Sequence, residues 1–408
     1  IAGFWNDMNE PGVFLTEKTA KPDTFHHPDK TFPYDTPHVG DGLAGNHKRY
    51  HNVYGMQMAR STFDGVKKLR PDKRPFVLTR AGFAGVQRFS AVWTGDNYAS
   101  WDHLALSIPM LTNLSVSGVP FVGCDVGGFN DRPSGELYTR WLQAGVLTPF
   151  LRSHSVGWAG NKEPWEFGDE FTKINRETIE LRYRFLPYIY SLFYQHERTG
   201  QPVMRPLWYE FPNDRSTYLM SDAYMLGGDL LVAPIVKEGL RNRDLYLPAG
   251  AAWINWWTGE KLEGGKQYRI DAPLDRFPLF VRAGAVIPMQ NAMQHTGEKS
   301  PLTLLVGVGI SPGKTETAEI HQDAGDGYGY LRSEWRHIRI EHRQGAITIR
   351  RIGDFRGEPV RYLEAVGLAA DPKEIRADGV KLKHEYDAST KRVRVELPGD
   401  VKEITLTR

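Results

Sequence analysis

The feature that most restricts the fold of this chain is a short apolar segment that ends in a charged residue and recurs through its first half. The first such segment contains Phe4 and Trp5 and ends at Asp7. In parallel barrels and doubly wound sheets, functional side chains collect where strands end. The residues that end the five segments are Asp7, Arg80, Asp96, Asp125, and Arg152 with His154. Repeated strand–helix units with chemistry at one edge predict a (β/α)8 barrel.

Helical periodicity separates these segments and continues after them. Apolar residues recur at helical spacing in residues 51–69, 101–116, 137–147 and 170–198. Pro109 should make the second helix irregular, Pro187 should kink the fourth, and Gly200 should end it. Five strands with these helices fit the second part of a barrel.

The pattern changes at about Ser216, where helical periodicity ends and short β segments bounded by glycine and proline follow. Such segments are typical of antiparallel β-sandwiches. A second β-rich unit begins near Pro301. The sequence therefore predicts an α/β plus all-β chain: a partial (β/α)8 TIM barrel in residues 1–215, a proximal β-sandwich domain in 216–299 and a distal β-sandwich domain in 300–408.

Two carboxylates at predicted strand ends stand close to tryptophan. Asp7 follows Trp5, and Asp96 follows Trp93. An isolated loop acid usually caps a turn, and that interpretation would leave Glu10 facing solvent. Two such acids instead favour cleavage of a glycosidic bond, which needs one carboxylate as nucleophile or base and another as proton donor.

The same residues carry a family resemblance. Trp-Asn-Asp-Met-Asn-Glu-Pro, from Trp5, and Trp-Thr-Gly-Asp-Asn, from Trp93, resemble the two signature segments of glycoside hydrolase family 31. Within this family the chain is most similar to the α-glucosidases, including the glucosidase II type. The likeness covers nearly the whole chain and weakens after about Pro301.

The resemblance implies a retaining α-glucosidase that hydrolyses terminal α-linked glucose. Asp7 takes the nucleophile position and Asp96 the acid/base position. No cofactor and no metal are implied, because the two carboxylates supply the chemistry. The residues implied to contact or support the sugar are Trp5, Met8, Arg80, Trp93, Asp125, Phe129, Arg152 and His154.

Composition limits the partners and the compartment. Lys and Arg number 51 and Asp and Glu 49, so no charge excess favours nucleic acid or a membrane surface. No apolar run is long enough to span a bilayer. Cys124 is the only cysteine, which excludes an intrachain disulfide and predicts a buried strand thiol. Low cysteine usage favours a cytoplasmic location.

The position of Asp7 near residue 1 also indicates how much of its enzyme this chain represents. In the resembled family the nucleophile follows the fourth barrel strand, after an N-terminal β-sandwich. We therefore expect the chain to be a C-terminal portion of its enzyme, with the N-terminal half as its missing partner. The expected ligand is an oligosaccharide or α-glucoside, and homo-oligomers remain possible.

Several alternatives stay open. An α-xylosidase, an α-transglucosylase or a lyase-type relative would share the motifs, and a non-catalytic carbohydrate-binding subunit would belong to another functional class.

Two metal sites could also be considered. Several histidines could suggest one, although their spacing fits neutral surface histidines better. Residues 323–326 could suggest calcium, although a hairpin turn with solvated acids fits better. The histidines in question are His26, His27, His38 and His47.

Overall fold

A parallel sheet organises the N-terminal part of the chain. The structure is a computed structural model that describes residues 3–13, 31–311 and 313–407. Four strands pair in the order β1-β4-β5-β6, and β7 pairs in parallel with β8. Their bounds are β1 Phe4–Asn6, β4 Val77–Thr79, β5 Ala91–Trp93, β6 Val122–Gly123, β7 Asp125–Val126 and β8 Arg152–Ser153. The predicted parallel strand order is present, with strands shorter than predicted.

The predicted strand through Cys124 is divided in two. β6 ends at Gly123 and β7 begins at Asp125, so Cys124 lies at the change from one sheet to the next. A Cβ at Gly123 would lie 2.2 Å from the Phe150 carbonyl oxygen, so only glycine allows this close approach. Cys124 is buried as predicted, and burial raises the pKa of its thiol to about 11.

Helices cover these strands, and local signals set their ends. Asn46, Ser100 and Ser134 accept backbone hydrogen bonds as N-caps of the first three long helices. Gly200 ends the fourth with φ 74°, as predicted, and Pro187 lies inside this helix without interrupting it. The helices are α1 His47–Leu69, α2 Trp101–Val116, α3 Gly135–Gly145, α4 Asp169–Thr199 and α5 Leu207–Glu210, with 3-10 turns at Val86–Arg88, Gly157–Ala159, Arg215–Thr217 and Gly329–Arg332.

The segment before α1 is partly ordered as a short hairpin. It contains the hairpin of β2 Pro37–His38 and β3 Gly45–Asn46. His47 is fully buried, and its ring nitrogens contact Thr31, His38 and His51 at 2.9–3.1 Å. The prediction of a surface histidine is therefore wrong for His47. His26 and His27 lie outside the described residues.

The middle of the chain forms a mixed layer of short antiparallel strands. A six-stranded sheet has the order β14-β13-β16-β11-β10-β9, and β12 pairs with β15. The bounds are β9 Met204–Arg205, β10 Tyr224–Leu226, β11 Leu230–Val232, β12 Asn242–Leu247, β13 Ala252–Asn255, β14 Lys261–Glu263, β15 Lys266–Asp271 and β16 Leu279–Arg282.

Two larger sheets end the chain, in the orders β17-β18-β22-β26-β25 and β19-β20-β21-β27-β23-β24. Ile and Val from both sheets fill one core between them. Pairing is antiparallel except between β18 and β22. The bounds are β17 Val286–Met289, β18 Leu302–Gly307, β19 Glu316–Gln322, β20 Arg336–Arg343, β21 Ala346–Ile352, β22 Val360–Val366, β23 Glu374–Ala377, β24 Val380–Leu382, β25 Glu385–Asp387, β26 Arg392–Glu396 and β27 Glu403–Thr407.

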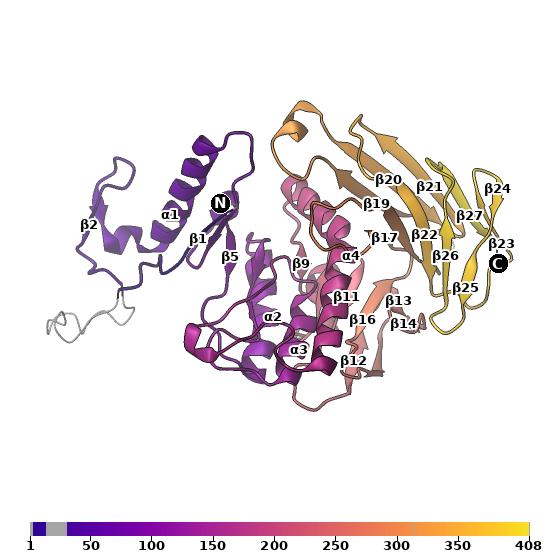
Figure 1. Ribbon diagram of the computed structural model, residues 1–408, viewed down its shortest axis with the longest axis horizontal. Coiled ribbons are helices and arrows are strands. Elements are labelled where there is room, and N and C mark those ends of the chain that lie inside the picture. The colour runs from indigo at the N-terminus through magenta and orange to yellow at the C-terminus, as the bar shows by residue number, and fades with distance from the viewer. Residues whose placement is uncertain (1–2, 14–30, 312, 408) are drawn as a thin grey trace.

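Hydrogen-bonded sheets cross both predicted domain boundaries. β9 precedes residue 215 but pairs with β10 of the middle sheet, and β17 precedes residue 300 but pairs with β18 of the distal sheet. In Figure 1, β1 and α1 lie at one end of the molecule, α4 in the middle and β20–β27 at the other end. Helix α4 contacts both β17 and β19, so it joins the helical part to the distal sheets.

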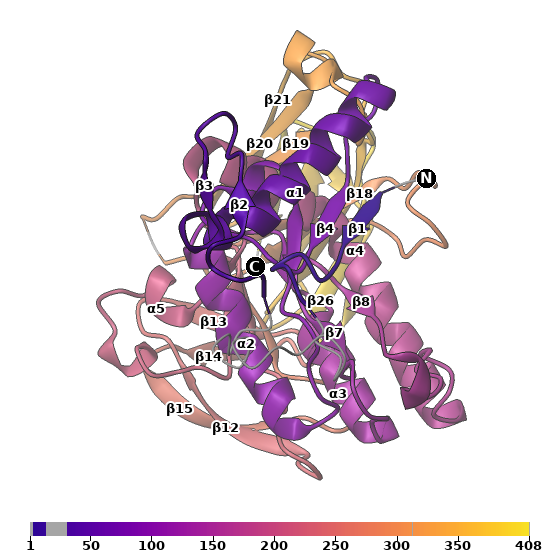
Figure 2. The same cartoon turned by 90° about the vertical axis from the view of Figure 1, so that its left-hand side faces the viewer.

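A buried ion pair ties the distal sheets to the parallel sheet. Arg74, between α1 and β4, contacts Asp323 through Nη2 at 2.5 Å and donates to the Tyr190 hydroxyl at 2.7 Å. Tyr190, on α4, donates in turn to Asp323 at 2.6 Å. We call these three residues the latch. Figures 1 and 2 both show the Gly329–Arg332 turn beside the C-terminal end of α1.

The prediction of solvated acids in this turn is wrong for Asp323, although Asp326 is 45% exposed. Only 3% of the Asp323 side chain is exposed. Burial alone would raise its pKa, but contacts with His321, Tyr190, the Gly325 amide and Arg74 hold the pKa of Asp323 well below its usual range. The ionised carboxylate therefore stabilises the folded chain.

Asp323→Asn should lower the free energy of unfolding by about 3 kcal/mol at pH 7, because it leaves Arg74 without its buried partner. The folded-state pKa lies below the unfolded value of about 3.9, so this contribution is present above that value and is lost as pH falls below it. Urea midpoints of the full-length protein at pH 7 and at pH 3–4 would measure both effects.

Lys73→Ala is the matched control. Lys73 contacts Asp326 of the same turn at 3.0 Å, but both side chains are nearly half exposed. An exposed pair contributes about 0–1 kcal/mol. Equal losses in the two variants would contradict the role of the latch.

Candidate active site

The loop after β1 holds the first predicted carboxylate. Asp7 follows Asn6, and the Met8 amide donates to Asp7 Oδ1 at 2.8 Å. Met8 itself has a left-handed backbone with φ 55°, which turns the chain sharply after the strand. The Asp7 side chain is 36% exposed, and Met8 as a whole residue is 37% exposed. The carboxylate is thus oriented by its own backbone and open to a ligand.

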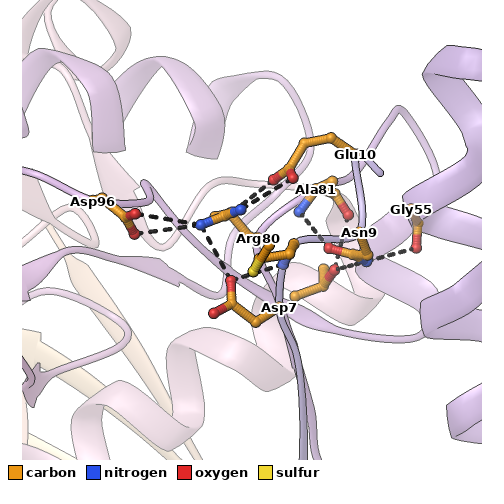
Figure 3. Close-up of polar contacts among 9 residues, drawn as sticks. Asp7, Asn9, Glu10, Gly55, Arg80, Ala81 and Asp96 are labelled. Atoms are coloured by element: carbon orange, nitrogen blue, oxygen red, sulfur yellow. Dashed lines mark hydrogen bonds and ion pairs between the residues drawn. The ribbon is translucent and has the colours of Figure 1, made fainter. Parts of the chain in front are cut away.

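Arg80 brings both predicted catalytic carboxylates to one nitrogen. Its Nη1 lies 3.3 Å from Asp7 Oδ1 and 3.4 Å from Asp96 Oδ1 (Figure 3). Arg80 follows β4, the neighbour of β1, while Asp96 follows β5 by three residues. Because both oxygens contact the same nitrogen, the distance between them cannot exceed the sum of these two distances. That limit accommodates the carboxyl separation of about 5–5.5 Å used by retaining glycosidases.

Glu10 completes this charged group. Arg80 Nε donates to Glu10 Oε1 at 2.7 Å and Nη2 donates to Oε2 at 3.1 Å, a bidentate pair. The hydrogen bond that Arg80 donates to Glu10 is the largest cause of its raised pKa, with the charges of Glu10, Asp7 and Asp96 adding to it. Sequence reasoning considered Glu10 only as a solvent-facing acid, although its place three residues after Asp7 was a usable signal.

Aromatic rings form a second group beside the charged one. Trp5 makes edge contacts with Trp93, at a centroid distance of 5.7 Å, and with His154, at 5.0 Å. Phe129 lies 5.4 Å from His154. Trp93 is only 2% exposed, whereas Trp5 is 46% exposed and offers an open ring. Burial and then the nearby Arg152 lower the pKa of His154, which favours the neutral ring.

A buried ion pair lies under these rings. Arg152 Nε donates to Asp125 Oδ1 at 2.6 Å, and its guanidinium lies 5.0 Å from the Trp5 ring and 4.8 Å from the Trp93 ring. Asp125 is fully buried, and burial raises its pKa to about 6 despite the Arg152 contact. Asp125 Oδ2 and Arg152 Nη2 are both buried without a hydrogen-bond partner in the described chain. Both atoms therefore have unused hydrogen-bonding capacity.

Two further residues position this side of the site and were missed from the sequence. Asn97 donates through Nδ2 to the Asp125 carbonyl at 3.0 Å and accepts the Phe129 amide through Oδ1 at 2.8 Å. Lys162 is buried and donates to the Gly128 carbonyl at 2.5 Å. Burial lowers the pKa of Lys162 to about 8. No local sequence pattern indicates these long-range contacts.

The ten residues predicted from the sequence fall into these two adjoining groups, linked by Trp5 and Asp7 on the same strand end. Asp7, Met8, Arg80 and Asp96 belong to the charged group and its loop, and the others to the aromatic group and its ion pair. Among the described residues, no cluster of three or more His, Cys, Asp or Glu is arranged to hold a metal ion. No described helix is long and apolar enough to cross a membrane.

Family profiles match this chain in two consecutive parts. The glycosyl hydrolases family 31 TIM-barrel domain matches residues 1–192, and the glycosyl hydrolase family 31 C-terminal domain matches residues 200–287. The chain belongs to glycoside hydrolase family 31. Membership confirms the resemblance and the expected fold class, a partial barrel followed by β domains.

Individual relatives agree with this membership. Alpha-glucosidase 2 of Bacillus thermoamyloliquefaciens is 39% identical over 382 residues, covering 93% of this chain and 47% of that protein. A family 31 dextranase of Flavobacterium johnsoniae, solved with glucose, superposes with a TM-score of 0.86 at 30% identity over 100% of this chain and 53% of its own. An α-xylosidase of Xanthomonas citri has a TM-score of 0.79 at 30% identity, covering 96% and 43%. The chain thus spans about half the length of these proteins.

Asp125 should titrate near pH 6 in the substrate-free protein, and Arg152→Met should move this titration to higher pH. The variant keeps the burial that disfavours the carboxylate and removes the cation that favours it. Because the folded pKa exceeds the unfolded one, the protonated group contributes stability at low pH that declines as pH rises from about 4 to 6. The carboxyl C=O stretch in infrared difference spectra would report the shift.

Asp125→Asn identifies the band, which should be absent from that variant at every pH. A carboxyl band that titrates near pH 4 in wild type, or that does not move in Arg152→Met, would contradict this assignment.

Proposed function

We propose that this chain carries the catalytic centre of a retaining α-glucosidase that removes terminal, non-reducing α-linked glucose from oligosaccharides. The observation that supports it most is the meeting of Asp7 and Asp96 at one Arg80 nitrogen. The two acids come from different strand ends, so only the tertiary fold brings them together. A pair of carboxylates beside an exposed tryptophan suits glycoside hydrolysis.

In this proposal the reaction has two steps. Asp7 attacks the anomeric carbon while Asp96 donates a proton to the glycosidic oxygen, so the bond to the leaving group breaks and a glycosyl–Asp7 ester forms. Asp96, now a carboxylate, removes a proton from water, whose oxygen attacks the same carbon and releases Asp7. Two inversions at that carbon retain its configuration.

Arg80 suits both steps because its contacts differ in strength. The contact with Glu10 is short and bidentate, whereas those with Asp96 are 3.4 Å long. Arg80 therefore stays held by Glu10 and favours the ionised Asp7, while a sugar can displace Asp96 from it at little cost. Free of Arg80, Asp96 can take up the proton that its first role requires.

The aromatic group would bind the glucosyl unit. In this proposal Asp125 and His154 hydrogen-bond its hydroxyls, with Arg152 supporting Asp125. Asp125 Oδ2, which has no partner in the described chain, is the strongest candidate acceptor. The residues proposed to line the sugar are Trp5, Met8, Trp93 and Phe129.

A family 31 α-xylosidase is the second candidate, because such an enzyme is among the similar solved structures. A transglucosylase would share the same first step and transfer the glucosyl unit to another sugar. A carbohydrate-binding subunit is disfavoured because both carboxylates are present and converge on Arg80.

The full-length protein should release nitrophenol from p-nitrophenyl α-glucoside much faster than from the α-xyloside or α-galactoside. Asp7→Asn should abolish this turnover, since an amide cannot act as the nucleophile. Preference for the xyloside would favour the second candidate, and wild-type turnover by Asp7→Asn would refute the mechanism.

Azide supplies the control for folding in Asp7→Gly. The small anion should enter the space of the missing carboxylate and restore part of the turnover, giving a glycosyl azide of inverted configuration. Recovery shows that the remaining site is intact.

Asp96→Ala should impair maltose hydrolysis far more than hydrolysis of an activated aryl glucoside. An aryl leaving group needs little protonation, so loss of a general acid, about 10²–10⁴-fold, should fall mainly on the sugar leaving group. Ratios of kcat/KM for the two substrates give the comparison. Equal losses would mean that Asp96 only positions the sugar.

A further inference from the structure

We infer that Asn9 is a positioning residue that fixes Arg80 between the two carboxylates. The inference rests on the proposed function and adds a residue to which no role in it has been assigned. Asn9 lies between Asp7 and Glu10 but contacts neither through its side chain. It is fully buried, and its amide points toward Gly55 of α1 and toward Ala81 (Figure 3).

The side chain of Asn9 binds the residues on both sides of Arg80. Its Nδ2 donates to Thr79 Oγ1 at 2.8 Å, and its Oδ1 accepts the Ala81 amide at 3.2 Å. One amide therefore holds the Thr79 side chain and the Ala81 backbone, on either side of Arg80. Glu10, the next residue, holds the guanidinium, so adjacent residues of one loop set the base and the tip of the same side chain.

A third contact joins helix α1 to this arrangement. Asn9 Nδ2 also donates to the Gly55 carbonyl at 3.2 Å. Both amide hydrogens are therefore donated, and the amide oxygen accepts one bond. A Cβ at Gly55 would lie 2.6 Å from Ala81 Cβ and 2.7 Å from the Asn9 carbonyl oxygen. Only glycine permits this approach, and the fit of α1 against the two loops leaves the Asn9 amide one position.

Replacing Asn9 has a specific expected consequence. Without the amide, the loops after β1 and β4 lose the bonds of Asn9 but keep the bond from the Arg80 amide to the Asn6 carbonyl at 3.2 Å, so Asp7 and Arg80 can shift relative to each other. A displacement of about 1 Å in a catalytic constellation costs on the order of 10²-fold in rate. The loss should appear in kcat rather than in KM, because Arg80 orients the reacting carboxylates while the aromatic group binds the sugar.

The test uses the full-length enzyme and p-nitrophenyl α-glucoside. Asn9→Ala should lower kcat on the order of 10²-fold with KM changed little. Asn9→Asp keeps the acceptor for Ala81 but loses both donors and buries a carboxyl group. Thr79→Val removes the acceptor for one Asn9 hydrogen and also the hydroxyl that donates to the Ala81 carbonyl at 2.9 Å. We expect kcat to fall in both, and less in Thr79→Val than in Asn9→Ala, so these variants keep the test decisive if Asn9→Ala does not fold.

Thr62→Val is the matched control. Thr62, on α1, accepts from Asn6 Nδ2 at 3.1 Å, a bond that also joins the β1 strand to α1 but does not touch the loop carrying Arg80. It should lower the melting temperature without the loss in kcat. Equal kcat losses in Thr62→Val and the Asn9 variants would overturn the inference, because general loosening would explain both.

The outcome is separable from the proposed function. Wild-type kcat in the Asn9 variants, with Asp7→Asn inactive, would refute the positioning role alone. Turnover by Asp7→Asn would refute the proposed mechanism whatever Asn9 does.

Discussion

The site depends on one cation surrounded by three carboxylates. Arg80 meets the carboxyl groups of Asp7, Glu10 and Asp96, which would repel one another without it whenever they are ionised together. The contacts are unequal, because Glu10 binds two nitrogens and the other two acids share the third. Glu10 therefore holds Arg80 in place, whereas Asp7 and Asp96 make weaker contacts that a bound ligand can change.

The sequence predicted which residues would meet but not what would hold them. Asp7 and Asp96 were recognisable because an acid beside tryptophan at a strand end is unusual. Asn9, Asn97 and Lys162 were not, because their partners lie tens of residues away and amide and ammonium groups bind whichever carbonyl the fold presents. Supporting residues of a site are therefore the part that local patterns do not reveal.

The same limit explains the errors outside the site. His47 and Asp323 were expected in solvent because polar residues among Gly, Pro and Asp usually are. Each is buried because other side chains satisfy it: His38 and His51, nine and four residues away, for His47, and Arg74, 249 residues away, for Asp323. The succession of parallel strands was predicted, but which sheet β17 joins depends on neighbours across the chain.

The latch has a consequence for how the enzyme is made. Arg74 and Asp323 are separated by 249 positions, and Arg74 is six residues ahead of Arg80. At about 5–20 residues per second, a ribosome needs on the order of 10–50 seconds between the two. During that interval the parallel sheet has emerged without the partner of Arg74. Because of this order of synthesis, the ion pair of Arg74 can form only after the distal sheet that carries Asp323 has been made.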